Sequence, residues 1–206
     1  MENSKKKYDL ARRELESLLS PFIKNKTVLH VGCLDHSLEK LELNPVHFFI
    51  ADYSKKCVGI DINKEVIKLR DRGYEVIHGD FYKLNLKNKF DVIFAGEVIE
   101  YLPNPGFFLK VAHKHLVKNG LLITTTPNPF FYKKFLEIIF KKEPHVHSYD
   151  YFYFCPKTLS KLLMDHEFKP LNFFWLNEAS HYSLGYIPIK FRNYFSSNFM
   201  IVSKKR

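Results

Sequence analysis

Acidic residues follow several short apolar runs in the first half of the chain. Asp61, Asp80 and Glu97 stand at or just beyond the ends of three such runs. The first of them lies 29 residues after Gly32, and the other two follow at intervals of 19 and 17 residues. A carboxylate accepts from two hydroxyls at once, so Asp61 suits a ribose diol, and Asp80 suits an adenine amino group. Because Gly32 lacks a Cβ, backbone can approach a ligand there. The pattern predicts a pocket for an adenosine-bearing ligand.

The elements that must position these residues alternate between strand and helix. Apolar and β-rich runs predict strands at 27–31, 57–62, 75–78, 90–95 and 121–125, and helical spacing predicts helices at 44–53, 63–72 and 105–116. Asn119 and Gly120 are expected to stop the last of these helices. Such alternation predicts an α/β fold with an open, Rossmann-like, doubly wound parallel sheet. Ligands bind at the carboxyl ends of the strands in such sheets, and all three acids fall there.

The two ends of the chain differ from this middle. Leucines spaced over residues 4–20 predict an amphipathic helix that Pro21 should stop. Beyond residue 129 we expect helices at 130–142 and 156–166, loops at 143–155 and 177–196, and strands at 170–176 and 197–203. A length of 206 residues favours one domain. The parts of this domain are a leading helix (1–26), a core that would bind the adenosine-bearing ligand (27–129) and a C-terminal part that would face a second ligand (130–206).

Composition excludes several classes of protein. The apolar runs are too short to span a membrane, there is no signal-peptide pattern, and peripheral membrane contact stays open. Three cysteines without a C-x-x-C pair predict neither disulfides nor a metal site, and favour a reducing, cytoplasmic location. The net charge is +10, but residues 27–155 carry 17 basic and 15 acidic residues, whereas residues 156–206 carry eight and three. A nucleic-acid partner is therefore not expected, and the basic surplus at the two ends of the chain could serve solubility, an anionic surface or an acidic substrate.

The sequence blocks that contain these predicted strands and the residues after them resemble those of class I S-adenosylmethionine-dependent methyltransferases. They are VLHVGC (28–33), VGIDIN (58–63), HGDF (78–81), FDVIFAGEVIEYLPNP (90–105) and LVKNGLLITTTPNP (116–129). Within that superfamily the chain is most similar to small bacterial and archaeal enzymes of glycan, cell-envelope and ubiquinone biosynthesis. The resemblance implies S-adenosylmethionine as cofactor and a sheet whose last strand is antiparallel. The chain departs from the usual pattern with His30 in place of an acid, Leu34 and a position near His36 in place of glycines, and Tyr101 in place of a histidine.

Carried over residue by residue, the resemblance assigns roles to two groups of positions. The expected cofactor-binding residues are Val31, Gly32, Cys33, Asp61, Ile62, Asp80, Phe81, Gly96 and Glu97. The expected acceptor-side, catalytic residues are Tyr101, Asn128, His145 and His147. A histidine titrates near neutral pH and can take a proton from an acceptor hydroxyl, and His147 matches the family's loop best. For Glu97, capping a helix is an equally good interpretation.

The function expected from these features is methyl transfer to an oxygen or nitrogen of a small-molecule, sugar or glycan-type acceptor. That acceptor would be phosphorylated, nucleotide-linked or lipid-linked, which suits the basic C-terminal part. Two alternatives stay open. A non-catalytic or RNA-binding protein with this fold would explain the lost glycines, and a nicotinamide-dependent oxidoreductase would share the ribose acid but lacks G-x-G-x-x-G after the first strand. The sequence does not indicate an oligomeric state.

Overall fold

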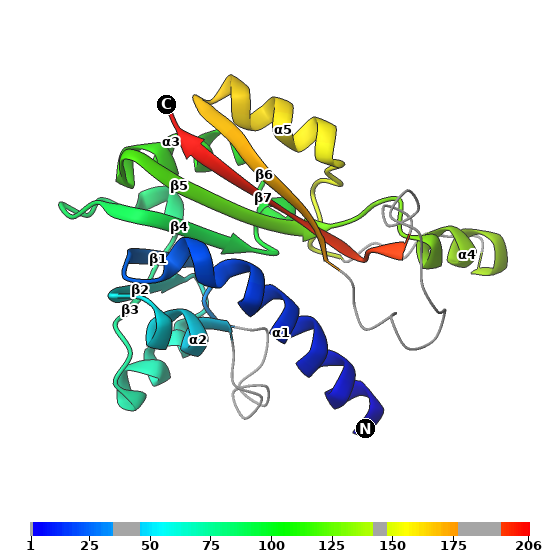
Figure 1. The fold of residues 1–206 in the computed structure, drawn as a ribbon, viewed down its shortest axis with the longest axis horizontal. Helices are drawn as coiled ribbons and strands as arrows, with labels where there is room; N and C mark the ends of the chain where they lie inside the picture. The colour runs from blue at the N-terminus through cyan, green and yellow to red at the C-terminus, as the bar shows by residue number, and fades with distance from the viewer. Residues whose placement is uncertain (1, 35–45, 142–147, 177–194) are drawn as a thin grey trace.

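The computed structural model describes residues 2–34, 46–141, 148–176 and 195–206. Its centre is one seven-stranded sheet with the order β3-β2-β1-β4-β5-β7-β6 (Figure 1). The strands are β1 (Thr27–Val31), β2 (Lys56–Asp61), β3 (Val76–His78), β4 (Phe90–Gly96), β5 (Leu116–Pro127), β6 (Phe168–Leu176) and β7 (Asn198–Lys205).

Strand direction follows the expectation for the fold class. β1 pairs in parallel with both β2 and β4, and β3 and β5 extend the parallel arrangement on either side. β7 runs antiparallel to both of its neighbours, β5 and β6. The fold is therefore an α/β, Rossmann-like sheet that is mostly parallel with an antiparallel last strand, as predicted. Strand order reverses beside β1, so the carboxyl ends of β1 and β4 flank a crevice.

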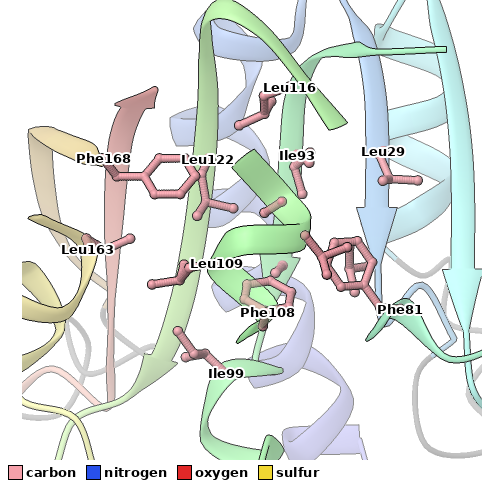
Figure 2. Close-up of a cluster of buried hydrophobic side chains, with 14 of the residues drawn as sticks. Leu29, Phe81, Ile93, Ile99, Phe108, Leu109, Leu116, Leu122, Leu163 and Phe168 are labelled. Atoms are coloured by element: carbon pink, nitrogen blue, oxygen red, sulfur yellow. The ribbon is translucent and has the colours of Figure 1, made fainter. Parts of the chain in front are cut away.

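Helices cover both faces of the sheet. Side chains of α1 (Glu2–Ile23) and α2 (Val46–Tyr53) pack with Val28 and Phe94 on one face. On the other face, α3 (Pro105–His115) and α5 (Pro156–Asp165) pack over Leu29 and Ile93 in the cluster that Figure 2 shows. Neighbouring strand residues thus point to opposite faces, and both faces are buried, which explains the continuous apolar runs.

Shorter helical segments connect the strands. The 3-10 helices η2 (Lys64–Arg72), η3 (Phe81–Lys83) and η4 (Ile99–Tyr101) follow β2, β3 and β4 respectively. The remaining helix, α4 (Tyr132–Lys141), follows β5 and stands beyond the carboxyl end of that strand (Figure 1). η2 occupies the range in which a regular helix was expected, with Asn63 as its N-cap.

Two boundary predictions are wrong. α1 continues through Pro21 to Ile23. Pro21 has no N–H to donate to the Ser17 carbonyl, and the Ser20 hydroxyl donates to that carbonyl instead, at 3.2 Å. Asn119 and Gly120 do not stop α3, which ends at His115. Instead, Asn119 adopts a φ of 63° inside β5, where the pairing with β4 shifts register. The positive φ there builds an irregularity in the strand.

Candidate functional site

A cavity of about 530 Å³ opens at the carboxyl ends of β1, β2 and β4. Its walls come from the ends of these strands and the segments after them, and from β3's end and α3. The lining residues are Val31, Gly32, Leu34, Ile60, Asp61, Ile62, Asn63, Gly79, Asp80, Phe81, Tyr82, Glu97, Val98, Tyr101, Leu102, Pro103 and Phe108. The three acids that sequence spacing singled out therefore share one cavity.

Asp61, at the end of β2, is held by two backbone amides. Its Oδ2 accepts from the Leu34 N–H and its Oδ1 from the Asn63 N–H, both at 2.9 Å. These bonds tie the end of β2 to the segment after β1 and fix the carboxylate's orientation. Each carboxylate oxygen retains a further lone pair, so both can still accept from a ligand's hydroxyls. This is the geometry that a vicinal diol requires.

Gly32 lets the chain turn beneath the cavity. Its φ is +69°, a conformation that residues with a Cβ rarely adopt. A Cβ added there would lie 2.6 Å from Cγ2 of Val98, which belongs to the segment after β4. The absent side chain therefore permits both the left-handed turn and the close approach of two neighbouring strand ends.

Asp80 and Tyr82 form the wall beyond β3. Asp80 caps η3, with its Oδ1 accepting from the Tyr82 N–H at 2.9 Å. The Tyr82 hydroxyl donates to the Asn104 carbonyl at 2.9 Å and accepts from the Asn104 N–H at 3.1 Å, which closes this side of the cavity. Sequence reasoning missed Tyr82, although its place two residues after a predicted ligand-binding acid was an available signal.

Glu97 stands immediately after β4 in an unusual backbone conformation, with a φ of 52°. Its N–H donates to both the carbonyl oxygen and Oγ1 of Thr125 at 3.1 Å, and that Oγ1 donates to Glu97 Oε1 at 2.9 Å. The conformation is sparsely populated by residues with a side chain, and such residues persist where surrounding contacts hold them. Thr125 on β5 thus fixes the orientation of the Glu97 carboxylate, and Glu97 lines the cavity.

Behind this wall lies Glu100, a buried carboxyl that is only 1% exposed. Its Oε2 accepts from Thr126 Oγ1 at 3.0 Å, and its Oε1 has no hydrogen-bond partner among the described residues. Burial, reinforced by the charges of Glu97 and Asp150, raises the pKa of Glu100 to about 9. The group is therefore protonated at neutral pH.

Tyr101 lines the cavity beside these acids. Partial burial and the neighbouring carboxyl of Glu100 raise the pKa of its phenol to about 12. A phenol with that pKa stays protonated at neutral pH, so it can donate a hydrogen bond but is a poor base. Tyr101 can therefore orient a polar group in the cavity without taking its proton.

Three of the expected site residues stand outside the cavity lining. Cys33 is 2% exposed, and its sulfur packs over Gly59. Burial raises the pKa of the Cys33 thiol, so the thiol stays protonated. Gly96 lies behind the wall, where a Cβ would come 2.8 Å from the Phe94 ring. Asn128 is fully buried.

Asn128 uses its polar atoms to hold neighbouring chain. Its Nδ2 donates to the Ser196 carbonyl at 2.7 Å, and its Oδ1 accepts from the Phe130 N–H at 3.0 Å. Its own N–H donates to the Ser197 carbonyl at 2.7 Å. The residue thus joins the end of β5 to the segment that leads into β7.

His30 replaces an acid of the usual motif, and its side chain does not line the cavity. It lies on the other face of β1, with its Nδ1 3.2 Å from Nδ1 of His47 on α2 and its ring 5.1 Å from that of Phe94. Burial lowers the pKa of His47 to about 4 and depresses that of His30 as well, with the His47 charge adding to the effect. Both imidazoles are therefore neutral at pH 7.

His145 and His147 lie outside the described residues. Within the described ranges, no three His, Cys, Asp or Glu side chains are grouped so as to hold a metal ion. No helix in those ranges is long and apolar enough to cross a bilayer.

Comparisons with known proteins identify a matching domain family and a shared fold. Residues 29–124, which run from β1 into β5, match a family described as a methyltransferase domain. No curated protein sequence matches the chain. Among solved structures, an S-adenosylmethionine-dependent methyltransferase from Archaeoglobus fulgidus is similar, with 18% identity, 94% of each chain covered and a TM-score of 0.67.

Two further structures share the fold over most of their length. Magnesium protoporphyrin IX methyltransferase from Synechocystis PCC 6803, with bound S-adenosylhomocysteine, has 11% identity and a TM-score of 0.68. The match covers 97% of this chain and 84% of that protein's chain. Burkholderia thailandensis 1,6-didemethyltoxoflavin-N1-methyltransferase has 14% identity and a TM-score of 0.64, with 95% and 78% covered. Residues 29–124 thus match a methyltransferase domain, and the fold of the chain is that of S-adenosylmethionine-dependent methyltransferases of known structure.

Proposed function

We propose that the protein transfers a methyl group from S-adenosylmethionine to an oxygen or nitrogen of a small-molecule, sugar or glycan-type acceptor. The observation that carries the proposal is the convergence of Gly32, Asp61, Asp80 and Glu97 on one cavity at the carboxyl ends of the strands. These residues are far apart in sequence, and each has a chemistry suited to one part of an adenosine-bearing ligand.

The residues present fit this cofactor in size and polarity. The cavity volume falls within the range of roughly 300–1,000 Å³ typical of sites for small ligands. Ile62 lines the cavity and is 74% exposed, so it offers an apolar surface to a flat ring. The glycine under the cavity leaves room that a Cβ would fill.

Each wall has a role in holding the cofactor. Asp61 would accept from the ribose hydroxyls and Asp80 from the adenine amino group, with Ile62 and Phe81 packing beside the ring. Val31, Gly32 and Glu97 would border the methionine end. Cys33 and Gly96 would support the wall from behind. When bound, the cofactor supplies an electrophilic sulfonium methyl group, so the protein's main task is to position the acceptor atom.

On the acceptor side, Tyr101 would orient the acceptor by donating a hydrogen bond. Asn128 would act as a positioning residue through the segment it holds beside β7. His145 and His147 remain proposed for this side, with His147 as the base for a hydroxyl acceptor. The basic residues of the C-terminal part favour a phosphorylated, nucleotide-linked or lipid-linked acceptor.

Cofactor binding is testable by titration calorimetry with Asp61→Ala. Hydrogen bonds to a charged group contribute about 1.5–3 kcal/mol, so the variant should bind S-adenosylmethionine and S-adenosylhomocysteine roughly tenfold to a hundredfold more weakly. Asp71→Ala is the matched control, because Asp71 is exposed on η2 and does not line the cavity. The control should bind like the parent protein.

The same titrations separate the alternatives. Binding of NAD in place of S-adenosylmethionine would indicate an oxidoreductase. Binding of RNA with a steep salt dependence, together with no binding of either methionine-derived ligand, would indicate a non-catalytic protein with this fold. Equal affinities in both aspartate variants would contradict the assigned role of Asp61.

A further inference from the structure

Helix α4 carries its apolar side chains on its outer side. Five of them, which we call the α4 face, are 41–80% exposed: Phe135, Leu136, Ile138, Ile139 and Phe140. Phe140 has the largest exposure, 80%. In contrast, Lys134 and Glu137 on the polar side of the same helix are only partly exposed. A surface helix normally buries its apolar stripe against the core, so the orientation of α4 is the reverse of the usual one.

Contacts on the polar side hold α4 in this orientation. The Lys134 Nζ lies 4.3 Å from the centre of the Tyr153 ring, a cation–π geometry. Partial burial lowers the pKa of Lys134, while the nearby negative charges of Asp150 and Glu137 oppose that shift. At the start of the helix, the Tyr132 ring lies 5.0 Å from that of Phe195. The polar side therefore faces the body of the protein, which leaves the α4 face outward.

The α4 face lies at the functional edge of the molecule. α4 follows the carboxyl end of β5, and Figure 1 shows it projecting beyond that end of the sheet. The carboxyls of Glu97 and Glu100 are close enough to influence Lys134 electrostatically. Phe130, just before the helix, is also 55% exposed. The exposed apolar surface thus adjoins the acceptor side of the proposed site.

We propose that the α4 face docks onto the surface of an anionic lipid bilayer. A ten-residue helix is too short to span a membrane, but an exposed apolar face on a helix that also carries an exposed lysine suits a helix lying in the interface. The exposed Lys133 belongs to the same helix, and the chain carries a net charge of +10. That charge attracts anionic headgroups.

Charge also disfavours a second copy of this chain as the occupant. Pairing two α4 faces would bring two chains of the same net charge of +10 together, with a lysine-bearing helix from each at the contact. An anionic bilayer supplies both the apolar layer and the opposite charge. Docking in this way does not require methyl transfer, so the proposal stands apart from the proposed function.

The test is co-sedimentation of the full chain with phosphatidylcholine vesicles that contain or lack phosphatidylglycerol. The parent protein should bind the anionic vesicles, and added salt should weaken binding. The double variant Ile139→Glu/Phe140→Glu should lower the partition coefficient by about tenfold or more, because two apolar groups are replaced by charges that anionic lipids repel. Lys133→Glu should weaken binding to anionic vesicles more than to neutral ones.

The matched control is Leu171→Glu/Met164→Glu, which adds the same two negative charges at side chains that are 46% exposed on β6 and 43% exposed on α5. It should bind vesicles far better than the α4 double variant. No binding of the parent protein to anionic vesicles, or equal loss in the control, would overturn the proposal. A parent dimer that light scattering shows becoming monomeric in the double variant would also overturn it, in favour of self-association. Calorimetry with S-adenosylhomocysteine on each variant tests cofactor binding separately.

Discussion

Replacing Glu100 with glutamine should change how the protein's stability depends on pH. Glu100 is buried, its pKa is raised from 4.5 to about 9, and the charge of Glu97 contributes to that shift. A carboxyl whose pKa is higher in the folded state takes up a proton on folding. Its stabilising contribution is therefore fully present below pH 4.5 and is lost as the pH rises to about 9. Glutamine does not titrate and lacks this dependence.

The size of the effect follows from the two pKa values. Between pH 4.5 and 9, each pH unit changes the free energy of unfolding by about 1.4 kcal/mol through this one group. From pH 5.5 to 7.5 the parent protein should therefore lose about 3 kcal/mol relative to Glu100→Gln. Any constant cost of the substitution, such as an altered bond to Thr126, cancels from this difference between two pH values.

Urea unfolding at several pH values measures the difference directly. The only tryptophan, Trp175, is half-buried on β6 with its ring 4.7 Å from that of Phe173, so its fluorescence should report unfolding. Glu97→Gln is an internal control: without the neighbouring charge, the pKa of Glu100 should fall and the pH dependence should end at a lower pH. A difference between Glu100→Gln and the parent protein that stays constant from pH 5.5 to 7.5 would refute the reasoning.

Two further substitutions test the packing around β1. The folded pKa of His47 is about 4, below its ordinary value of 6.5. Its contribution to the free energy of unfolding is therefore constant above pH 6.5 and falls by about 3 kcal/mol as the pH drops to 4. His47→Gln should make the fall in urea unfolding smaller, leaving the part that comes from the buried His30, and a parallel loss in both proteins would contradict it. Gly32→Ala should destabilise the fold and weaken S-adenosylhomocysteine binding, because its φ is +69° and its Cβ would meet Val98. Gly73→Ala is the control, since its φ is +87° but the space around it is open. Equal stability and affinity in the two alanine variants would show that close approach at Gly32 is unimportant.

Much of the cavity at the carboxyl ends of the strands could be predicted from the sequence. Strand ends are marked locally by apolar runs, and parallel strands bring their carboxyl ends to one edge whatever their order. Asp61, Asp80 and Glu97 were therefore correctly expected to lie together, and all three line the cavity. The boundary at Pro21 was predicted wrongly because a neighbouring hydroxyl, Ser20, replaces the missing donor.

The part of the chain after β4 was less predictable, because its features depend on contacts between distant segments. Asn128 is buried by its contact with Ser196, 68 residues away. Glu100 is shielded by Thr126 and by the backbone of residues 151–152, whose amides donate to its carbonyl. Amphipathic spacing predicted a helix near residues 130–142, but the same spacing fits a helix that packs on the core and one that faces outward.

The sequence by itself determined the class of fold, the order of strands and helices along the chain, and which acids end which strands. These are properties of residues close together in the chain, set by periodicity and backbone preference. Only the tertiary structure decided that Gly32 packs closely against Val98, that the Glu100 carboxyl is buried and that the apolar side of α4 faces outward. Each of these depends on how segments far apart in sequence exclude solvent from one another, and solvent exclusion is a property of the packed chain alone.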